Sequence, residues 1–433
     1  MRRLRDYKLG PSINDQRGFY QCARTTIEIR AWQLDQFNDQ WQTIRHSVPY
    51  FARLNHEQKL PERFSSWQQF KEHMPLMDRK TLQTNREGIH DRRRKPDFWK
   101  STGGSTAEPV QMGAWTSENK FAQRDLWFAR SWFGVTPSAR LFLIWGHSHL
   151  LGTGLRGRIN GVKRKLSDVI LGYFRCSAYD LSDEKLRVAA ESLLQFRPDY
   201  VVAYAGALDL FTRVNQDLRS SFHKLRLKVA IATAESFPKA DSVEFIADIL
   251  GCPVVMEYGS VETGLLAHQV PEGNFKIFWR HYFLEGKESD HLPGSYEIFI
   301  TSLYPRACPL VRYRIGDLIS ENPDDEKFAQ EFLGVVGRCN DLLSLPNGKT
   351  IHSEAFSHAV KESRSIANFQ VVQSADGDIA LNYVAAAPLE EVELMHIRDR
   401  LTRINPDLKN IPIEKVELLE QTIAGKTRRI FRQ

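Results

Sequence analysis

The stretch Ser101-Thr102-Gly103-Gly104-Ser105-Thr106-Ala107-Glu108-Pro109 is the most unusual segment of this 433-residue sequence. Adjacent glycines and small hydroxyl residues allow backbone N–H groups and hydroxyl groups to converge on phosphate oxygens, because no bulky side chain blocks the approach. The segment is not a Gx4GK[ST] loop, since no lysine follows its second glycine. Clusters of Gly, Ser and Thr also form ordinary surface turns, so this segment alone leaves a phosphate loop and a turn as alternatives.

Regular apolar patterns lie on both sides of this segment. Between Trp32 and Pro49, apolar residues recur at three- and four-residue steps, which predicts an amphipathic helix that ends at the proline. From about Arg140 to Gly259, short apolar runs alternate with longer helix-like segments. The runs are residues 141–145, 200–203, 227–232 and 253–256. Such alternation is typical of an α/β domain.

The sequence changes character after Asp341. Residues 369–373 and 379–384 are predicted strands around a turn-forming segment, which indicates a hairpin. A helix is predicted over residues 394–404, and the alternation of Val416 and Leu418 predicts a further strand. The tail is therefore predicted to be an α+β domain of roughly 90 residues.

The composition limits the class of protein. The 59 Lys and Arg residues exceed the 53 Asp and Glu residues by six, too few to indicate a nucleic-acid partner, which normally requires a concentrated basic face. Five cysteines lie far apart with no CxxC pair, so neither a disulfide framework nor a thiolate zinc site is expected. No segment approaches the ~18 apolar residues of a membrane span. We expect a soluble cytoplasmic protein with no membrane span.

A competing motif is Gly152-Thr153-Gly154-Leu155-Arg156-Gly157, which has the GxGxxG spacing of dinucleotide-binding proteins. Its glycines do not sit directly at the end of the preceding strand-like run, and no acidic residue follows about 20 positions later. A dehydrogenase is therefore a weak alternative.

Four further motifs follow in a fixed order. They are Glu257-Tyr258-Gly259-Ser260-Val261-Glu262, Arg312-Tyr313-Arg314-Ile315-Gly316-Asp317, Gly337-Arg338-Cys339-Asn340-Asp341 and Gly425-Lys426. Each one alone has an ordinary explanation as a turn, a solvated charge or a loop tip. Together with residues 101–109 and in this order, they resemble the adenylate-forming superfamily of acyl-CoA synthetases, luciferases and adenylation domains. The likeness is greatest to the phenylacetate–CoA ligase-like branch, which includes relatives encoded with capsular-polysaccharide pathways.

The resemblance covers nearly the whole chain, from His46-Ser47-Val48-Pro49-Tyr50-Phe51 to Lys426. It implies a large N-terminal α/β domain, with sheets flanked by helices and a small barrel, over residues 1–340. It implies a small mobile α+β domain over residues 341–433, with Asp341 as the hinge. Dimers are common in this branch, so a homodimer is one expected oligomeric state.

The resemblance also implies a nucleotide site. The loop expected to hold the β- and γ-phosphates of ATP comprises Thr102, Gly103, Gly104, Ser105 and Thr106. The segment expected beside the adenine comprises Thr233, Ala234 and Glu235, and Tyr258 is expected to stack on it, with Glu257, Gly259 and Ser260 as its neighbours in the motif. Asp317 is expected to accept hydrogen bonds from the ribose hydroxyls, and Arg338 to contact ribose and phosphate.

The remaining implied roles concern catalysis and the acid. Glu262 is expected to bind Mg²⁺, and Lys426 is expected to be the adenylation lysine. His147 lies where the family places residues near the acyl substrate, although an unassigned histidine is an equally good explanation. Tyr204 and Gly206 resemble the border of the acyl pocket, where small neighbouring residues leave room for an aromatic ring.

The implied reaction is ATP-dependent conversion of a carboxylic acid to an acyl-adenylate with release of pyrophosphate, followed by transfer to CoA. The expected cofactors are ATP, Mg²⁺ and CoA, and the expected partner is a small-molecule carboxylic acid. One alternative acceptor is an amine, such as an amino sugar or a natural-product intermediate. An alternative of another class is a catalytically weak nucleotide-binding scaffold.

Four positions depart from the family pattern. Ala107 stands where glycine is usual, and Glu108 where lysine is frequent. Val261 replaces the Ser or Thr that commonly precedes the magnesium-binding acid, and Ser260 is a candidate substitute. Thr233 stands where the adenine segment usually has glycine. These departures leave adenylation as the main hypothesis and keep the scaffold alternative open.

Overall fold

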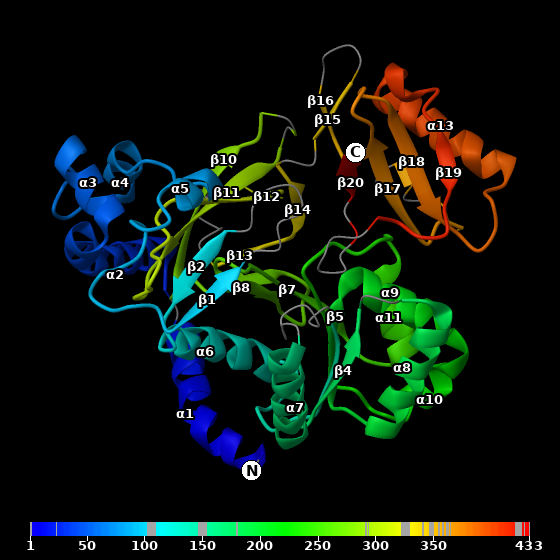
Figure 1. The fold of residues 1–433 in the computed structure, drawn as a ribbon, viewed down its shortest axis with the longest axis horizontal. Helices are drawn as coiled ribbons and strands as arrows, with labels where there is room; N and C mark the ends of the chain where they lie inside the picture. Colours follow the sequence, from blue (N-terminus) through cyan, green and yellow to red (C-terminus); the bar gives the residue numbers. More distant parts are fainter. Residues whose placement is uncertain are drawn as a thin grey trace. The chain divides into compact units, whose positions relative to one another are not determined.

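The computed structural model describes most of the chain. The described residues are 2–22, 24–101, 110–145, 154–178, 181–290, 292, 294–321, 330–339, 342–345, 350–353, 356, 359–360, 363, 365–420, 427 and 429–432. They divide into two compact units. The first unit comprises Met1–Asp6, Phe133–Met256 and Gly337–Gln433, and the second comprises Tyr7–Trp132 and Glu257–Val336. Figure 1 labels elements of both units where there is room.

A parallel sheet forms the centre of the first unit. Its strands are β3 (Leu141–Trp145), β4 (Tyr173–Ser177), β5 (Tyr200–Tyr204) and β6 (Ala230–Thr233), in the order β6-β5-β3-β4. All of their pairings are parallel. The strands β5 and β6 are buried along their whole length, as expected for strands covered on both faces.

Helices follow these strands as the α/β pattern predicts. They are α7 (Gly154–Leu171), α8 (Asp183–Phe196), α9 (Ala205–Val214), α10 (Arg219–His223) and α11 (Ser242–Leu250), with the 3-10 turn η2 (Gln216–Leu218) before α10. In α8, Leu186, Ala190 and Leu193 are buried at helical spacing and pack on the sheet. The predicted α/β fold of this region is confirmed.

The C-terminal part of the first unit is α+β. A four-stranded sheet has the order β19-β18-β17-β20, from β17 (Asn368–Gln373), β18 (Ile379–Val384), β19 (Ile413–Lys415) and β20 (Ile430–Arg432). The helix α13 (Glu391–Ile404) packs Ile397 and Leu401 into its core. A short pair, β15 (Leu342–Ser344) and β16 (Thr350–His352), and the 3-10 turn η4 (Pro406–Leu408) complete the described elements.

The predicted hairpin is confirmed, but one predicted strand is misplaced. The turn between β17 and β18 contains Gly377 at φ 93°, a left-handed conformation that suits glycine. The strand predicted at residues 416–418 instead occupies Ile413–Lys415, where it pairs with β18. The side chain of Leu418 is 72% exposed. Alternation alone suggested the wrong register, because Ile413 is the residue that packs against the core.

The second unit begins with helices. They are α2 (Thr26–Ser47), α3 (Pro49–Gln58), α4 (Trp67–His73), α5 (Arg79–Thr84) and α6 (Glu118–Ser131), and α1 (Arg2–Gln21) leads into the unit. A capping box formed by Thr25 and Glu28 starts α2, and the helix ends before Pro49, as predicted. Phe37 and Trp41 of α2 are buried in the main apolar cluster of this unit.

The strands of the second unit are antiparallel. One group contains β10 (Tyr282–Glu288), β11 (Tyr296–Ser302) and β12 (Tyr313–Ile319), and β14 (Val335–Arg338) begins at the end of the unit. Another group pairs the end of β7 (Val254–Ser260) with β8 (Gly264–Gln269), then β9 (Phe275–Ile277) and β13 (Glu331–Phe332). A hairpin joins β1 (Phe98–Ser101) to β2 (Gln111–Ala114).

Among the described residues, none of the helices combines the length and the apolar character that a membrane crossing requires.

Candidate functional site

Several predicted site residues lie outside the part of the chain that the structure describes. They are Thr102, Gly103, Gly104, Ser105, Thr106, Ala107, Glu108, His147, Asp341 and Lys426. The hinge and the boundary between residues 1–340 and 341–433 stay predictions. The other predicted residues belong to one or the other unit, and each group is described within its own unit.

In the second unit, the predicted adenine-stacking residue and the predicted ribose-binding acid meet. Tyr258 lies on β7 and Asp317 on β12, and the Tyr258 hydroxyl donates a hydrogen bond of 2.9 Å to Asp317 Oδ2. Both residues are buried, with 9% and 6% exposure. The Tyr258 ring also makes an edge contact with Phe332, at 5.9 Å between ring centroids. The fold therefore joins two residues that are 59 positions apart in the sequence.

Gly259 allows β7 and β8 to approach each other closely. A Cβ atom added at Gly259 would collide with the backbone oxygen of Gly264, the first residue of β8. The register of this pair shifts between Tyr258 and Gly259, which indicates a β-bulge. The motif therefore needs glycine here for a steric reason, and the bulge directs the chain into the turn that carries Glu262.

Glu262 lies in this tight turn, which has its own hydrogen bonds. The Ser260 backbone N–H donates to Thr263 Oγ1 at 3.1 Å, and the Thr263 backbone N–H donates to Ser260 Oγ at 3.3 Å. The Ser260 hydroxyl, the candidate substitute for a hydroxyl at position 261, is thus part of the turn itself. Val261 is 45% exposed.

Two side chains of the second unit hold Glu262. The Tyr313 hydroxyl donates to Glu262 Oε1 at 3.3 Å, and the Arg306 guanidinium donates through Nη2 to the backbone oxygen of Glu262. Burial and the nearby Glu262 carboxylate raise the pKa of Tyr313, so its hydroxyl remains a neutral donor. One half-buried carboxylate, whose second oxygen has no hydrogen-bond partner among the described residues, fits Mg²⁺, which commonly takes one or two carboxylates together with substrate phosphates and water. The described residues contain no cluster of three or more His, Cys, Asp or Glu side chains that could hold a metal ion.

Arg306 belongs to a buried polar network beneath the turn. Its Nε atom lies 3.6 Å from Glu118 Oε2, and both side chains are nearly inaccessible, at 2% and 4% exposure. Glu118 Oε1 also accepts hydrogen bonds from the backbone N–H groups of Trp115 and Ala307, at 2.8 and 2.9 Å. The ion pair therefore ties the start of α6 to the segment that supports Glu262.

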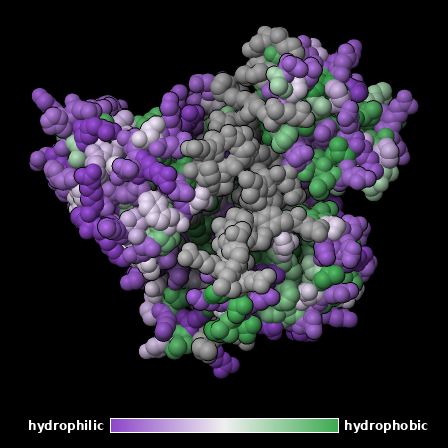
Figure 2. All heavy atoms as spheres, in the orientation of Figure 1, coloured by the Kyte–Doolittle hydropathy of each residue, from purple (hydrophilic) through white to green (hydrophobic). Residues whose placement is uncertain are grey.

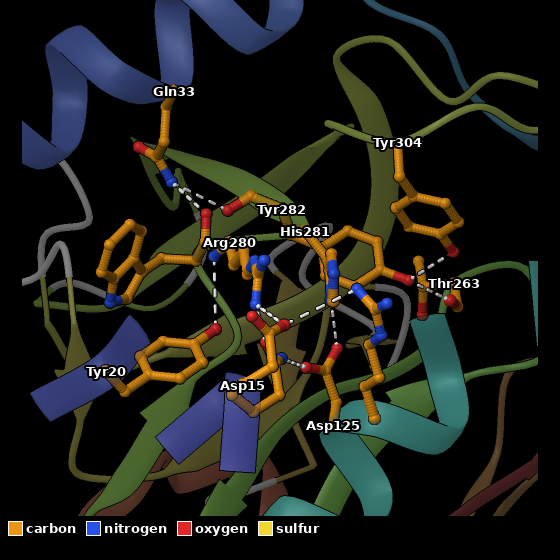
Figure 3. A network of polar contacts seen from close by, with 12 residues as sticks. Asp15, Tyr20, Gln33, Asp125, Thr263, Arg280, His281, Tyr282 and Tyr304 are labelled. Atoms are coloured by element: carbon orange, nitrogen blue, oxygen red, sulfur yellow. Dashed lines mark hydrogen bonds and ion pairs between the residues drawn. The ribbon is translucent and has the colours of Figure 1, made fainter. Parts of the chain in front are cut away.

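A second branch of the network reaches Thr263 (Figure 3). The Tyr282 hydroxyl donates to the Thr263 backbone oxygen and lies 3.0 Å from the Tyr304 hydroxyl. The neighbouring His281 places Nδ1 2.5 Å from Asp125 Oδ2, and Gln16 Nε2 donates to the other oxygen of Asp125 at 2.5 Å. Burial raises the pKa of Asp125. Glu262 and Thr263, at the end of the 260–263 turn, are thus connected to buried groups of the second unit.

Glu257, the first residue of the motif, faces a different partner. Its carboxylate lies 3.9 Å from Arg130 Nη2 on α6, and its side chain is 15% exposed. Burial raises the pKa of Glu257. His268 stands opposite Glu257 on β8, and burial lowers the pKa of His268 to about 4. Glu257 is therefore a largely buried residue of the sheet, and its partner is Arg130.

In the first unit, the predicted adenine segment and the predicted acyl segment meet at the carboxyl ends of two neighbouring parallel strands. Glu235 follows β6, Gly206 follows β5, and Gly206 N–H donates to Glu235 Oε1 at 2.9 Å. A Cβ added at Gly206 would lie only 2.9 Å from that oxygen. Ligands of open α/β sheets bind at this edge.

The backbone of the adenine segment is strained at one residue. Ala234 has φ 72°, in the left-handed region that side chains other than glycine rarely adopt. From the sequence, Thr233 is the residue that stands where the family usually has glycine. In the structure, Thr233 is the last residue of β6 and is extended. The left-handed position is therefore one residue later.

Tyr204, at the end of β5, places its ring 4.4 Å from that of Trp145. Arg338 is exposed at the end of β14.

Sequence reasoning missed three residues around Glu262. Tyr313 stood inside the quoted 312–317 motif, so its proximity to a site was detectable, whereas its contact with Glu262 was not. Thr263 directly follows Glu262 in the sequence, but its hydrogen bonds with Ser260 could not be predicted from the sequence. Arg306 carried no sequence signal, because its role depends on burial against Glu118.

Comparison with known proteins finds similar sequences for parts of this chain. Residues 343–433 match the model of the CapK C-terminal domain. Protein CapK from Staphylococcus aureus is 23% identical over 289 residues, which are 62% of this chain and 59% of that protein. Phenylacetate-coenzyme A ligase from Escherichia coli (strain K12) is 23% identical over 288 residues, 63% of this chain and 62% of that one. The chain thus matches less than two thirds of the length of either relative.

A solved structure resembles almost the whole chain. The crystal structure of 2-hydroxyisobutyryl-CoA ligase in the postadenylation state, in complex with R3-HIB-AMP, superposes with a TM-score of 0.68 at 14% identity, over 93% of this chain and 89% of that one. The fold is that of the adenylate-forming ligases. Together with the CapK and phenylacetate-coenzyme A ligase matches, it confirms the resemblance to the phenylacetate–CoA ligase-like branch of that superfamily.

Proposed function

We propose that this protein uses ATP to convert a carboxylic acid to an acyl-adenylate with release of pyrophosphate. The observation that carries this proposal is the hydrogen bond between Tyr258 and Asp317. Tyr258 lies on the strand that leads into the turn with Glu262, and Asp317 lies on β12. An aromatic ring, a ribose-binding carboxylate and a phosphate-proximal acid are the groups that a bound nucleotide requires. The adenylate-forming fold supports the same assignment.

The reaction brings two anions together. The substrate carboxylate attacks the α-phosphorus of ATP, the bond to the leaving pyrophosphate breaks, and negative charge grows on the phosphoryl oxygens. Tyr258 and Asp317 would orient the nucleoside, and Lys426 would place a positive charge against the phosphoryl group. Mg²⁺ held by Glu262 would supply compensating charge for the phosphates.

The second half-reaction is proposed to transfer the acyl group to CoA. The thiolate of CoA attacks the carbonyl carbon, a thioester forms and AMP leaves. The phenylacetate-coenzyme A ligase relative and the CoA ligase fold support this acceptor. A small aromatic acid is the proposed substrate, because the segment around Tyr204 and Gly206 has little side-chain bulk and an aromatic border. We also propose that the protein is located in the cytoplasm and forms a homodimer.

Adenylation is tested by trapping acyl-adenylates with hydroxylamine across a panel of aryl and aliphatic acids while pyrophosphate release is measured. At least one acid should give ATP-dependent hydroxamate and stoichiometric pyrophosphate. Lys426→Ala should reduce the rate on the order of 10²–10³, by analogy with other positioned electrostatic donors. Lys409→Ala, an exposed lysine of the same C-terminal region, is the matched control and should keep the wild-type rate. Turnover with none of the acids would leave the scaffold alternative and overturn the enzyme proposal.

The acceptor is tested by mass spectrometry of the products with CoA alone, with a panel of amines alone, and with both. An acyl-CoA thioester should form with CoA. An acyl-adenylate that persists with CoA and is consumed only by an amine would contradict the thioester step and favour the amide-forming alternative.

A further inference from the structure

The helix α7 carries apolar side chains on its solvent-exposed face. Five of them are unusually exposed for their type. They are Ile159 at 47%, Val162 at 67%, Leu166 at 62%, Val169 at 77% and Ile170 at 38%. Their spacing of three, four, three and one residues places them on one side of a helix. We call these five residues the α7 stripe. In Figure 2, hydrophobic atoms gather at the lower edge of the molecule, where α7 ends in Figure 1.

The opposite side of α7 is the one anchored to the sheet. Asp168 is only 14% exposed, and both of its oxygens accept hydrogen bonds from Arg175 Nε on β4, at 3.0 and 2.9 Å. This contact fixes the rotation of the helix about its axis. The α7 stripe therefore faces away from the first unit, and its exposure is a property of the packed helix.

Basic residues flank the stripe. Lys163 and Lys165 are both exposed, and at 3.6 residues per turn they fall on opposite sides of it. Long lysine side chains can extend their charge past an apolar surface while their methylene groups cover it. An exposed apolar face with lysines along its borders is the pattern of a helix that lies in the headgroup region of an anionic membrane.

The apolar surface continues beyond the end of the helix. An open groove of about 480 Å³ begins at Val169 and is lined by the rings of Tyr173, Phe174 and Phe196. The Arg140 guanidinium belongs to this groove and lies 4.2 Å above the centre of the Phe196 ring. Asp168, which is paired with Arg175, also lines this groove, so the groove combines apolar rings with one cation and one paired acid.

A second copy of the chain fits this surface less well. The stripe spans residues 159–170, which is about 17 Å of a helix roughly 10 Å wide. A stable protein interface takes about 20–30 residues on each partner, whereas the stripe has five. Two stripes packed against each other would also bring the flanking lysines of both copies together. A lipid surface has neither restriction.

We propose that the α7 stripe, with Lys163 and Lys165, docks this protein on the surface of a membrane rich in anionic phospholipid. The helix lies parallel to the surface, its apolar side chains enter the interface between headgroups and acyl chains, and its lysines contact lipid phosphates. This inference is independent of the proposed ligase activity.

The proposal is tested by co-sedimentation of the full-length protein with vesicles of phosphatidylcholine containing about one third phosphatidylglycerol, and with phosphatidylcholine vesicles alone. The protein should bind the anionic vesicles more tightly, and binding should weaken as salt is added. Lys163→Gln with Lys165→Gln should weaken binding roughly 25-fold, about fivefold for each lysine. Leu166→Asp with Val169→Asp should reduce binding at least as much, since both apolar insertion and charge attraction are lost.

A matched control lies on the helix α8 of the same unit. Lys185 and Val188 are exposed there, and Lys185→Gln with Val188→Asp should change binding less than twofold. All variants alter exposed residues, so their unfolding midpoints should equal that of the wild type. Failure of the wild type to bind anionic vesicles overturns the proposal, and so does equal weakening by the α7 and α8 variants. Sedimentation equilibrium without vesicles that shows a dimer abolished only by the α7 variants would assign the stripe to a second copy instead, which also overturns it.

Discussion

The two units support their candidate site residues in different ways. Glu262 in the second unit rests on a buried polar network that includes Arg306, Glu118 and Tyr313. Glu235 in the first unit follows a parallel strand that packs in an apolar core, accepts a hydrogen bond from Gly206 and comes directly after the left-handed backbone of Ala234. The position of Glu262 in the second unit is therefore set by several coupled polar contacts. The position of Glu235 in the first unit is set by the end of β6 and by the backbone conformation of Ala234.

This difference has a physical consequence. A buried charged group that loses its partner retains the full cost of its desolvation, so the network of the second unit should fail as a whole. An apolar parallel sheet tolerates changes in the segments that follow its strands, because its stability comes from the packing of the strands themselves. Substitutions in the two units should therefore differ in both size and kind.

The largest effect is expected at the buried ion pair. Arg306→Met should lower the free energy of unfolding by about 3–5 kcal/mol, because Glu118 is left charged and buried without its cation. Urea unfolding measures this value. The matched control in the first unit is Arg219→Met. This variant breaks an ion pair with Asp248 whose side chains are 50% and 56% exposed, and it should leave the free energy of unfolding nearly unchanged, because water screens exposed pairs.

A double variant makes the first comparison stricter. Glu118→Gln keeps an oxygen for the backbone N–H groups of Trp115 and Ala307, so Glu118→Gln with Arg306→Met should recover part of the lost stability. Equal effects of Arg306→Met and Arg219→Met would contradict the distinction between the two units.

The next effect concerns activity. Glu262→Gln should reduce adenylation on the order of 10²–10³, equivalent to about 3–4 kcal/mol, while the free energy of unfolding changes by less than about 1 kcal/mol. The carboxylate is only partly buried and keeps its Tyr313 contact as an amide. Pyrophosphate release at saturating ATP and urea unfolding give the two values. Glu235→Gln in the first unit is the comparison, and a loss there as large as at Glu262 would show that both acids contribute equally.

Stability of the second unit should depend on pH through His268. This residue has 0% exposure, and burial lowers its pKa to about 4. Since an unfolded histidine titrates near 6.5, the unfolded state binds a proton that the folded state refuses as the pH falls from about 6.5 to about 4. Stability should decrease over this range by up to about 3 kcal/mol, and remain constant above it as far as this group is concerned.

The control for this pH effect removes the titrating group. His268→Gln should flatten the decrease, whereas His56→Gln, at an exposed position of α3, should leave it unchanged. Unfolding free energies measured by urea from pH 4 to pH 8 make the comparison. An unchanged pH profile in His268→Gln would remove His268 as the cause.

The smallest effect is expected in the first unit. Ala234→Gly relieves a left-handed conformation that costs roughly 1–2 kcal/mol, but it also increases the entropy of the unfolded chain. The net result should be a gain of about 0.5–1 kcal/mol in the free energy of unfolding. Ala189→Gly, in the interior of α8, is the control and should destabilise the protein by about 1 kcal/mol or more. A loss of stability in Ala234→Gly would show that the strain is offset elsewhere.

The sequence by itself determined much of the architecture. Short apolar runs that alternate with helix-like segments from 140 to 259 predicted an α/β region, since a strand buried on both faces must be apolar along its length; the parallel pairing of its strands came from the structure. The hairpin at 369–384 followed from two alternating runs around a glycine turn. The ordered motifs at 257–262 and 312–317 identified Tyr258, Glu262 and Asp317 as candidate site residues, because short segments with unusual residue types can be recognised without knowledge of the fold.

Only the tertiary structure decided which of these residues meet and what supports them. The contact of Tyr258 with Asp317 depends on the pairing of distant strands, and the role of Arg306 depends on burial next to Glu118. The exposure of the α7 stripe likewise follows from the rotation that Asp168 and Arg175 impose on the helix. Periodicity shows that a helix has an apolar side, whereas desolvation and packing determine whether that side is inside the protein or available to a partner.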